Sequence, residues 1–334
     1  MDEAALAIEA RGLTKRYGPT LAIDDVDLDV PAGTVLGLLG PEGAGKTTML
    51  RLIAGLRRPT RGDVTLGWTD DGARSTRHAG HMALRRRVGV VDQEPAFYDW
   101  MTGRELLAFV GGLLGLAGEE LRSRVDAVLE RQGLDADADR RIEGYGSALR
   151  KRLAVAQAIV GRPGLVLLDE PFVGLDPDGA AELRDLVVEL GGRATVVVAS
   201  SDPATARLCE RIGVLDAGRL VAEGEPDDLL ERVDPPGYVI EVDPGEEPGI
   251  ALLVDALRRQ AWVRDVNVEG HVLRVAVRHA GLAAMRLVPL LGTSGLPIRR
   301  VERRSPTLPD LLAALDPEQA LEAPAGGAAA EAAR

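Results

Sequence analysis

Residues 40–48 of the chain read GPEGAGKTT. The apolar run at 34–39 before them has the length of a buried strand, and the apolar residues of 49–53 after them are spaced like one face of a helix. A strand, a glycine-rich turn and a helix start form a phosphate-binding loop, because backbone N–H groups and the positive end of the helix dipole converge on one anion. Lys46 would reach the outer phosphates, and the Thr47 hydroxyl is placed to hold a magnesium ion.

An ordinary glycine-rich turn is the alternative to a phosphate-binding loop. The Gly-Lys-Thr sequence and both flanking elements favour the phosphate-binding loop. Only three of the 40 basic residues are lysines, so a lysine at this position is less easily explained by chance. The predicted ATP-binding residues of the loop are Gly40, Pro41, Glu42, Gly43, Ala44, Gly45, Lys46, Thr47 and Thr48.

A second apolar run, at 165–168, ends in Asp169-Glu170-Pro171. It reads as a buried parallel strand that delivers two carboxylates at its carboxyl end, where open α/β sheets bind their ligands. Asp169 would hold the magnesium ion directly or through water, and Glu170 would orient or deprotonate an attacking water. The alternative is a pair of solvated acids at a strand end.

Composition narrows the class of protein. The 334 residues suffice for about two domains, and 46% hydrophobic with 28% charged residues is typical of a globular protein. The formal net charge of −12 argues against a nucleic-acid partner. No apolar run approaches the ~20 residues of a membrane span, and the acidic N-terminus does not resemble a signal peptide. A cytoplasmic location is therefore expected, with the single cysteine, Cys209, packed rather than reactive.

Before the loop, residues 6–10 and 21–30 alternate apolar and polar side chains, which predicts antiparallel strands with one wet face. Tyr17 between them could stack on a nucleotide base or lie on a surface turn, and both interpretations stay open. Residues 63–66 predict another strand, and 69–80 predict a polar loop that carries His78 with its neighbour His81 as solvated side chains.

The middle of the chain predicts a helical subdomain over about 95–160. Thr102 and Glu105 form a capping box that opens one helix. Further elements are expected as a strand at 87–92, helices at 119–132, 149–160 and 177–190, and a strand at 195–199.

After a proline-containing linker at 234–237, residues 237–315 predict a small accessory domain. Its strands and helices follow the order βαββαβ, which is a ferredoxin-like pattern. The predicted elements are strands at 238–242, 263–268, 271–278 and 298–303, and helices at 249–260 and 280–291. The alanine-rich tail at 316–334 is expected to be frayed helix or disorder.

The motifs Tyr17, GPEGAGKTT, Gln93, LLDEP and GLDP, in this order and spacing, resemble the ATP-binding subunits of ABC transporters over roughly residues 6–235. The resemblance implies an α/β fold for 1–233: a P-loop core with an antiparallel β subdomain and an inserted helical subdomain, followed by the small α+β ferredoxin-like domain. It also implies ATP and Mg²⁺ as cofactors, with Tyr17 stacked on adenine and Gln93 in the magnesium shell.

The same resemblance implies partners. Gln93 would sense a separate transmembrane permease subunit, and Asp176 would lie at the interface of a homodimer, or of a heterodimer with another ABC ATPase. The chain would then sit peripherally on the cytoplasmic face of the membrane. Residues 305–312, SPTLPDLL, resemble the ending of drug-resistance ATPases of the daunorubicin-exporter type.

Two departures from the family pattern predict slow hydrolysis. Residues 145–149, YGSAL, replace the signature Leu-Ser-Gly-Gly-Gln, so Gly146, Ser147 and Ala148 form a degenerate version of it. Ser201 and Asp202 stand where the family has its switch histidine, and losing such a donor to the transferring phosphoryl group costs about 10² to 10³ in rate. Glu42 also stands where the family usually has asparagine.

The leading interpretation is therefore the ATP-binding subunit of a multidrug, natural-product or lipid exporter. The alternative is a catalytically attenuated, ATP-gated regulatory or assembly subunit of a membrane complex, which the two departures would also suit. A ribosome-associated ABC protein fits less well, since such proteins carry two ATP-binding domains in one chain.

Overall fold

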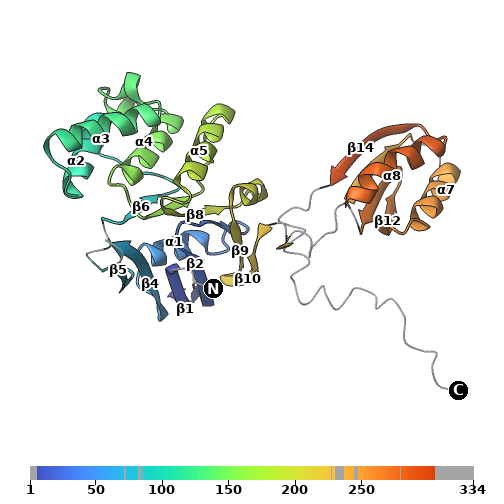
Figure 1. The fold of residues 1–334 in the computed structure, drawn as a ribbon, viewed down its shortest axis with the longest axis horizontal. Coiled ribbons are helices and arrows are strands. Elements are labelled where there is room, and N and C mark those ends of the chain that lie inside the picture. Colours follow the sequence, from blue (N-terminus) through green and yellow to red (C-terminus); the bar gives the residue numbers. More distant parts are fainter. Residues whose placement is uncertain are drawn as a thin grey trace, which may run out of the picture. The chain divides into compact units, whose positions relative to one another are not determined.

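The computed structural model describes residues 6–70, 73–81, 84, 86–226, 228–229, 237–243, 247–278 and 280–304. The chain divides into two compact units, Met1–Pro226 and Asp227–Arg334 (Figure 1). The predicted disordered tail and the linker residues 234–236 lie outside the described residues.

A six-stranded sheet organises the first unit, with strand order β10-β9-β3-β8-β7-β6. All neighbours are parallel except the β9–β10 pair. β3, β7 and β8 are buried along their whole length, as expected for parallel strands covered on both faces. The strands are β3 (Val35–Leu39), β6 (Val88–Val91), β7 (Leu165–Asp169), β8 (Thr195–Ser200), β9 (Arg211–Asp216) and β10 (Arg219–Gly224).

The register of this sheet determines where the site forms. Leu39 pairs with Ser200, and Asp169 pairs with Ala199, so β3, β7 and β8 end level with one another. The segments that follow them therefore emerge at one edge. Helix α1 (Lys46–Ile53) starts at this edge, and its Met49 and Ile53 are fully buried in the core.

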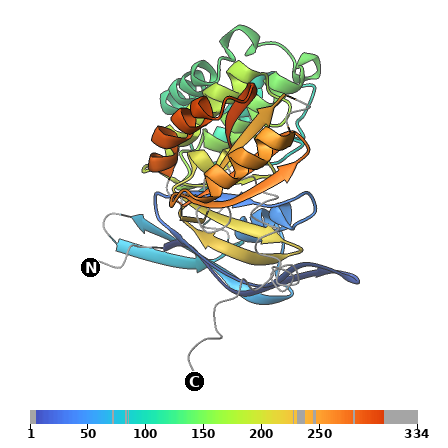
Figure 2. The ribbon, with the colours of Figure 1, turned by 90° about the vertical axis from the view of Figure 1, so that its right-hand side faces the viewer.

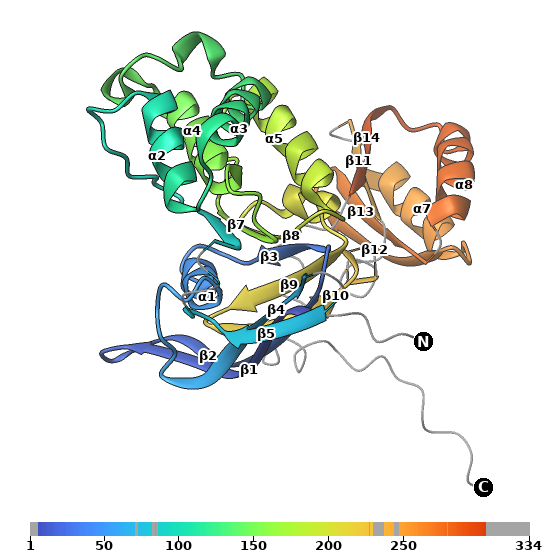
Figure 3. The same ribbon diagram turned by 60° about the vertical axis from the view of Figure 1, so that its left-hand side comes forward.

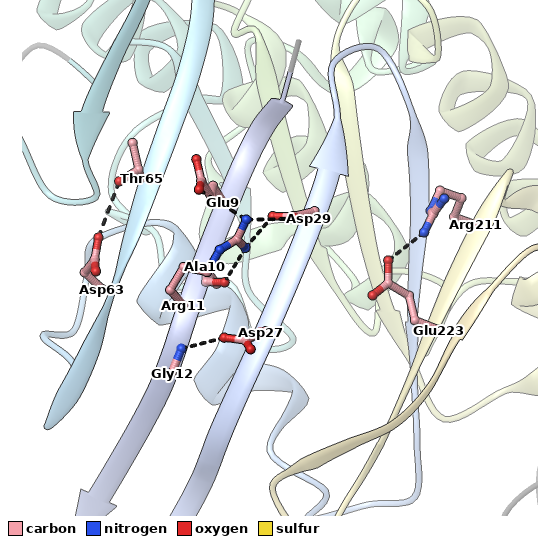
Figure 4. A network of polar contacts seen from close by, with 10 residues as sticks. All are labelled: Glu9, Ala10, Arg11, Gly12, Asp27, Asp29, Asp63, Thr65, Arg211 and Glu223. Carbon is pink, nitrogen blue, oxygen red and sulfur yellow. Dashed lines mark hydrogen bonds and ion pairs between the residues drawn. The ribbon is translucent and has the colours of Figure 1, made fainter. Parts of the chain in front are cut away.

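An antiparallel sheet of order β2-β1-β4-β5 completes the core on the other side of α1. Figure 4 shows its charged face, where Arg11 on β1 contacts both carboxylate oxygens of Asp29 on β2, at 2.5 and 2.9 Å. This pattern of apolar residues inward and charges outward confirms the predicted wet face. The strands are β1 (Leu6–Tyr17), β2 (Thr20–Pro31), β4 (Arg61–Asp70) and β5 (Ala73–His78).

One prediction in this region is wrong. The predicted loop at 69–80 contains a strand instead, because β5 pairs with β4 over six residue pairs, from Thr65–His78 to Asp70–Ala73. The segment ARSTRH lacks the apolar alternation that marks a strand, and an edge strand needs none when it is held by backbone hydrogen bonds. His78 is exposed on this strand with its Nδ1 3.4 Å from Asp63.

Three helices, α2 (Gly103–Leu113), α3 (Gly118–Arg131) and α4 (Ser147–Ile159), cluster together at the end of the unit opposite the antiparallel sheet (Figures 1 and 3). The capping box at the start of α2 is confirmed, since Thr102 and Glu105 exchange both hydrogen bonds. α4 starts two residues before its predicted position. α5 (Pro177–Leu190) begins and ends where predicted, with the Asp176 side chain accepting from the Gly179 N–H.

β9 and β10 have no counterpart among the elements predicted from the sequence. Residues 203–208 form a short 3₁₀ helix, and Cys209 follows it in extended conformation. The Cys209 side chain is buried, as expected, and burial raises the pKa of its thiol to about 12.

The second unit has the predicted order β11-α7-β12-β13-α8-β14 and a sheet of order β12-β13-β11-β14, which confirms the ferredoxin-like fold. Both helices bury apolar side chains, such as Leu257 and Leu287, in one core with the sheet's Ile240 and Val275, so they share one face of it (Figure 2). The elements are β11 (Gly237–Val242), α7 (Glu247–Arg258), β12 (Val263–Glu269), β13 (Val272–Val277), α8 (Ala280–Thr293) and β14 (Ile298–Arg304).

Candidate functional site

The loop between β3 and α1 forms a cradle that depends on glycine at two positions. A Cβ at Gly40 would lie 2.2 Å from the carbonyl oxygen of Leu215, and a Cβ at Gly45 would lie 2.5 Å from the carbonyl oxygen of Ala22. Gly45 also has φ of 104°, in the left-handed region, directly before the first turn of α1. The loop therefore packs against β9 and β2 so closely that only glycine fits at these two positions.

Lys46, the first residue of α1, is 6% exposed and points back into the loop. Its ammonium donates to the carbonyl oxygens of Gly40 and Pro41, both at 2.9 Å. Its Nζ also lies 3.5 Å from Oε1 of Glu170, the residue that follows β7. The buried cation is thus compensated by two carbonyl dipoles and one carboxylate.

Asp169, the last residue of β7, is 3% exposed and lies beside Thr47. Burial raises the pKa of its carboxyl above the usual value, and the hydrogen bond with Thr47 opposes that rise. Its Oδ1 is buried without a hydrogen-bond partner among the described residues. A buried carboxylate oxygen left free beside a hydroxyl is the donor set that suits a hard divalent cation.

Glu170 adopts φ of +42°, which is unusual for a residue with a side chain. Its N–H donates to the carbonyl of Ala199 at 2.9 Å, so β8 holds this backbone although the sheet has ended. The turn directs the Glu170 carboxylate toward Lys46 rather than toward solvent, and the side chain is only 10% exposed.

A cleft of about 370 Å³ opens over the loop at the carboxyl edge of the sheet. It brings together predicted residues from four segments far apart in the sequence. They are Glu42, Gly43, Gly45, Lys46, Thr47, Thr48, Gln93, Glu170 and Ser201. The start of β2, at Thr20–Ala22, also lines the cleft, and no sequence motif had singled it out.

The sequence profile of the ABC transporter family matches residues 23–173. The daunorubicin resistance ATP-binding protein DrrA3 of Streptomyces coeruleorubidus is 34% identical over 310 residues, which cover 92% of this chain and 95% of that protein. This chain belongs to the ABC transporter ATP-binding proteins. The Nod factor export ATP-binding protein I of a Bradyrhizobium strain is 32% identical over 316 residues, covering 93% of this chain and 96% of its own.

Solved structures of ABC ATPases share the fold. An ATP-binding subunit of an ABC transporter aligns with a TM-score of 0.60 at 26% identity, over 68% of this chain and 92% of its own. The cassette MJ0796, solved as a dimer bound to ADP and Pi, aligns with a TM-score of 0.58 at 26% identity, over 66% and 98%. The chain is therefore an ABC-type ATPase subunit, and no helix within its described residues combines the length and hydropathy needed to cross a bilayer.

Other residues that the ABC resemblance pointed to lie outside the cleft. Tyr17 ends β1 rather than lying on a turn, is 41% exposed, and has Lys15 Nζ 5.0 Å from its ring centroid. Gly146 caps α4 and Ser147 begins it, both exposed, and no side chain caps that helix start. Asp202 accepts a hydrogen bond from the N–H of Ala204 at 2.9 Å, so its carboxylate caps the 3₁₀ helix.

Lys151 is the buried cation that motif reasoning missed in this ABC ATPase. It sits in the second turn of α4, is 5% exposed, and donates to the main-chain carbonyls of Gln93 at 2.9 Å and Glu170 at 3.4 Å. Burial lowers the pKa of its amine, and the nearby acids Asp169, Glu170 and Asp92 oppose that. The only signal in the sequence was the scarcity of lysine.

Proposed function

We propose that this chain binds ATP with Mg²⁺ in the cleft over residues 40–48 and hydrolyses it to drive a separate membrane-embedded partner that exports a small molecule. One observation carries the proposal: the Lys46 ammonium, 3.5 Å from the Glu170 carboxylate, joins the phosphate loop to the end of β7. Relatives over nearly the whole length of the chain carry names of drug resistance and Nod factor export, which supports the export role.

Lys46 and the loop would bind the polyphosphate. The Lys46 ammonium donates hydrogen bonds to the carbonyls of Gly40 and Pro41. Phosphate oxygens are stronger acceptors because they are charged, so they would draw the ammonium away from at least one carbonyl. The backbone N–H groups of the loop and the positive end of the α1 dipole would bind the same anion. Tyr17, exposed at the end of β1, supplies an aromatic face for adenine.

Mg²⁺ would be held by the Thr47 hydroxyl, the unpartnered Oδ1 of Asp169 and the Gln93 side chain, the last two directly or through water. When bound, the ion neutralises charge on the β- and γ-phosphates. The Asp169 carboxyl must be ionised to serve as a ligand. Its raised pKa opposes ionisation, and the positive charge of a bound magnesium ion would favour it.

Glu170 would act as the base. Its carboxylate accepts a proton from a water molecule while that water's oxygen bonds to the γ-phosphorus and the bond to the ADP oxygen breaks. The left-handed backbone of Glu170 is what places the carboxylate over the loop, next to Lys46. With φ in the ordinary range, the side chain would leave the strand end in a different direction.

An exposed aromatic cluster supports docking of a membrane partner near Gln93. Tyr98 and Trp100 are 54% and 66% exposed, with ring centroids 6.2 Å apart, and Phe109 on α2 lies 6.3 Å from Tyr98. Large aromatic side chains are rarely left in water together unless a partner covers them. The loop from Gln93 to the capping box therefore links the cleft to this surface. A second ATPase chain, identical or different, would complete the dimer.

Hydrolysis is expected to be slow, because Ser201 lines the cleft where the family has a histidine. A steady-state phosphate-release assay tests base and attenuation together. The native chain should turn over slowly, Glu170→Gln should lower the rate by about 10² or more, and Ser201→His should raise it. A fast native rate would reject the attenuation, and calorimetry at millimolar Mg²⁺ that detects no ATP binding would reject the function.

A second function, ATP-gated docking without a need for turnover, is favoured by one feature: the start of α4 carries Gly146-Ser147-Ala148 in place of the signature. Export complementation separates the two. If docking suffices, cells carrying Glu170→Gln keep export while Lys46→Ala cells lose it; if turnover is required, both variants lose it.

A further inference from the structure

Lys151 contacts the main chain on both sides of the cleft. Its ammonium reaches the carbonyl of Gln93, on the loop after β6, and the carbonyl of Glu170, on the turn after β7. The two carbonyls belong to residues 58 and 19 positions away in the sequence. Both residues also line the cleft. One buried cation on α4 therefore joins the two loops that would present the base and a magnesium ligand.

The backbone of Glu170 needs such support. A non-glycine residue at positive φ is strained, and it persists only where its surroundings hold it on several sides. The N–H of Glu170 donates to the carbonyl of Ala199, and its own carbonyl accepts from the Lys151 ammonium at 3.4 Å and from the Val173 N–H at 3.3 Å. Removing the ammonium would leave the carbonyl with only the Val173 contact, which lies within the turn itself and does not attach the turn to α4.

The neighbouring residue on α4 extends the connection toward the aromatic cluster. Arg150 forms an ion pair with Asp99 at 2.8 Å, and its guanidinium lies 5.2 Å from the ring centroid of Phe97. The loop 93–99 is thus attached to α4 at both of its ends, once through Lys151 and once through Arg150.

A purely structural role is the competing explanation, and the chain offers a matched control for it. Arg124 on α3 is also a cation withdrawn from solvent that donates to two main-chain carbonyls, those of Val160 at 2.9 Å and Ile159 at 2.6 Å. It does so at the C-terminal end of α4, away from every residue of the cleft. If Lys151 only satisfied carbonyls, its loss would resemble the loss of Arg124.

We propose that Lys151 is a positioning residue for ATP hydrolysis, whose ammonium ties the main chains of Glu170 and Gln93 to α4 and so keeps the base aligned with the phosphate loop. The inference rests on the proposed function, in which Glu170 is the base. It assigns Lys151 no contact with ATP, so nucleotide affinity and turnover should respond differently to its loss.

The test compares Lys151→Met, Lys151→Arg and Arg124→Met in the full-length protein. For Lys151→Met we expect kcat to fall by about tenfold or more, with the Kd for ATP and Mg²⁺ changed by less than about threefold, because misplacing a base affects the transition state alone. Lys151→Arg should restore much of kcat, since a guanidinium can still donate to two carbonyls. Arg124→Met should keep kcat within about twofold. Unchanged kcat in Lys151→Met, or an equal loss in Arg124→Met, overturns the proposal.

Hydrogen exchange supplies a readout that does not depend on turnover. The amides of Gln93, Glu94, Glu170, Phe172 and Val173 should exchange faster in Lys151→Met than in the native protein, and not in Arg124→Met. If the native protein binds ATP but releases no phosphate, the proposed function fails, and hydrogen exchange still tests whether Lys151 holds the two loops. Unchanged exchange in Lys151→Met would overturn that role. If Lys151→Met does not fold, the comparison is made with Lys151→Arg. A folded variant with native exchange but altered ATP affinity would contradict the positioning role of Lys151.

Discussion

The Lys46–Glu170 ion pair predicts that the effect of Glu170→Gln on stability depends on nucleotide. The substitution removes one charge from two side chains that are 7% and 10% exposed and 3.5 Å apart. At an effective dielectric constant of ~20, their attraction is about 332/(20 × 3.5), or roughly 5 kcal/mol. Lys46 keeps both carbonyl bonds, and the uncharged glutamine no longer bears the cost of its own burial. We therefore expect a net loss of only about 1 to 3 kcal/mol in the free energy of unfolding.

Thermal unfolding measures this loss. For a unit of this size, 1 kcal/mol corresponds to roughly 2 to 4 °C, so Glu170→Gln should lower Tm by about 2 to 12 °C without nucleotide. With saturating ATP and Mg²⁺, the phosphates replace the carboxylate as the counter-charge of Lys46, and the deficit should shrink or reverse. Glu182→Gln is the control, because the pair of Glu182 with Arg152 is 61% exposed on the acid side and should contribute little. An equal deficit with and without nucleotide would refute the reasoning.

Three further predictions concern single sites. Gly45→Ala should abolish ATP binding in calorimetry, since its Cβ would meet a backbone oxygen at 2.5 Å, whereas Gly18→Ala, with φ of 58° but nothing within 4 Å, should only lower Tm. Cys209 should react with thiol reagents about 10³-fold more slowly in the folded protein at pH 8 than after unfolding, because its pKa of about 12 leaves little thiolate; equally fast labelling would contradict its burial. As the pH is lowered, protonation of Asp169 should weaken the magnesium-dependent binding of ATP, and because the pKa of Asp169 is raised, this weakening should begin at a higher pH than for an ordinary aspartate. Asp169→Asn should show low affinity without that pH dependence.

Much of the fold could be predicted because its strongest signals are local. The fully buried strands β3 and β7 are continuous apolar runs. The starts of α2 and α5 are set by Thr102 and Asp176, whose side chains cap the first turn. β5 carried no such signal. Its strand conformation comes from pairing with β4, and a polar edge strand looks like a loop until its partner is known.

The candidate site divides in the same way. The loop 40–48 and the pair Asp169-Glu170 are contiguous motifs, so residue types and spacing were enough to predict them. That they meet depends on the level ending of β3, β7 and β8, which is a property of sheet register. The contribution of Thr20–Ala22 to the cleft could not be predicted for another reason: these residues line the cleft because of where β2 starts, and their side chains carry no distinctive chemistry.

Lys151 shows a third kind of limit. Its partners are main-chain carbonyls, which every residue possesses, so nothing in the identity of Gln93 or Glu170 indicates that they accept hydrogen bonds from it. One of these carbonyls belongs to Glu170, which adopts positive φ, and positive φ at a glutamate cannot be predicted from composition. A strained backbone at the predicted base, held on one side by β8 and on the other by α4, means that whatever moves α4 also moves the base. The departures at Gly146-Ser147-Ala148 lie at the start of that same helix, so the slow hydrolysis that we propose has a route besides direct contact with a nucleotide, along α4 to Lys151 and from there to Glu170.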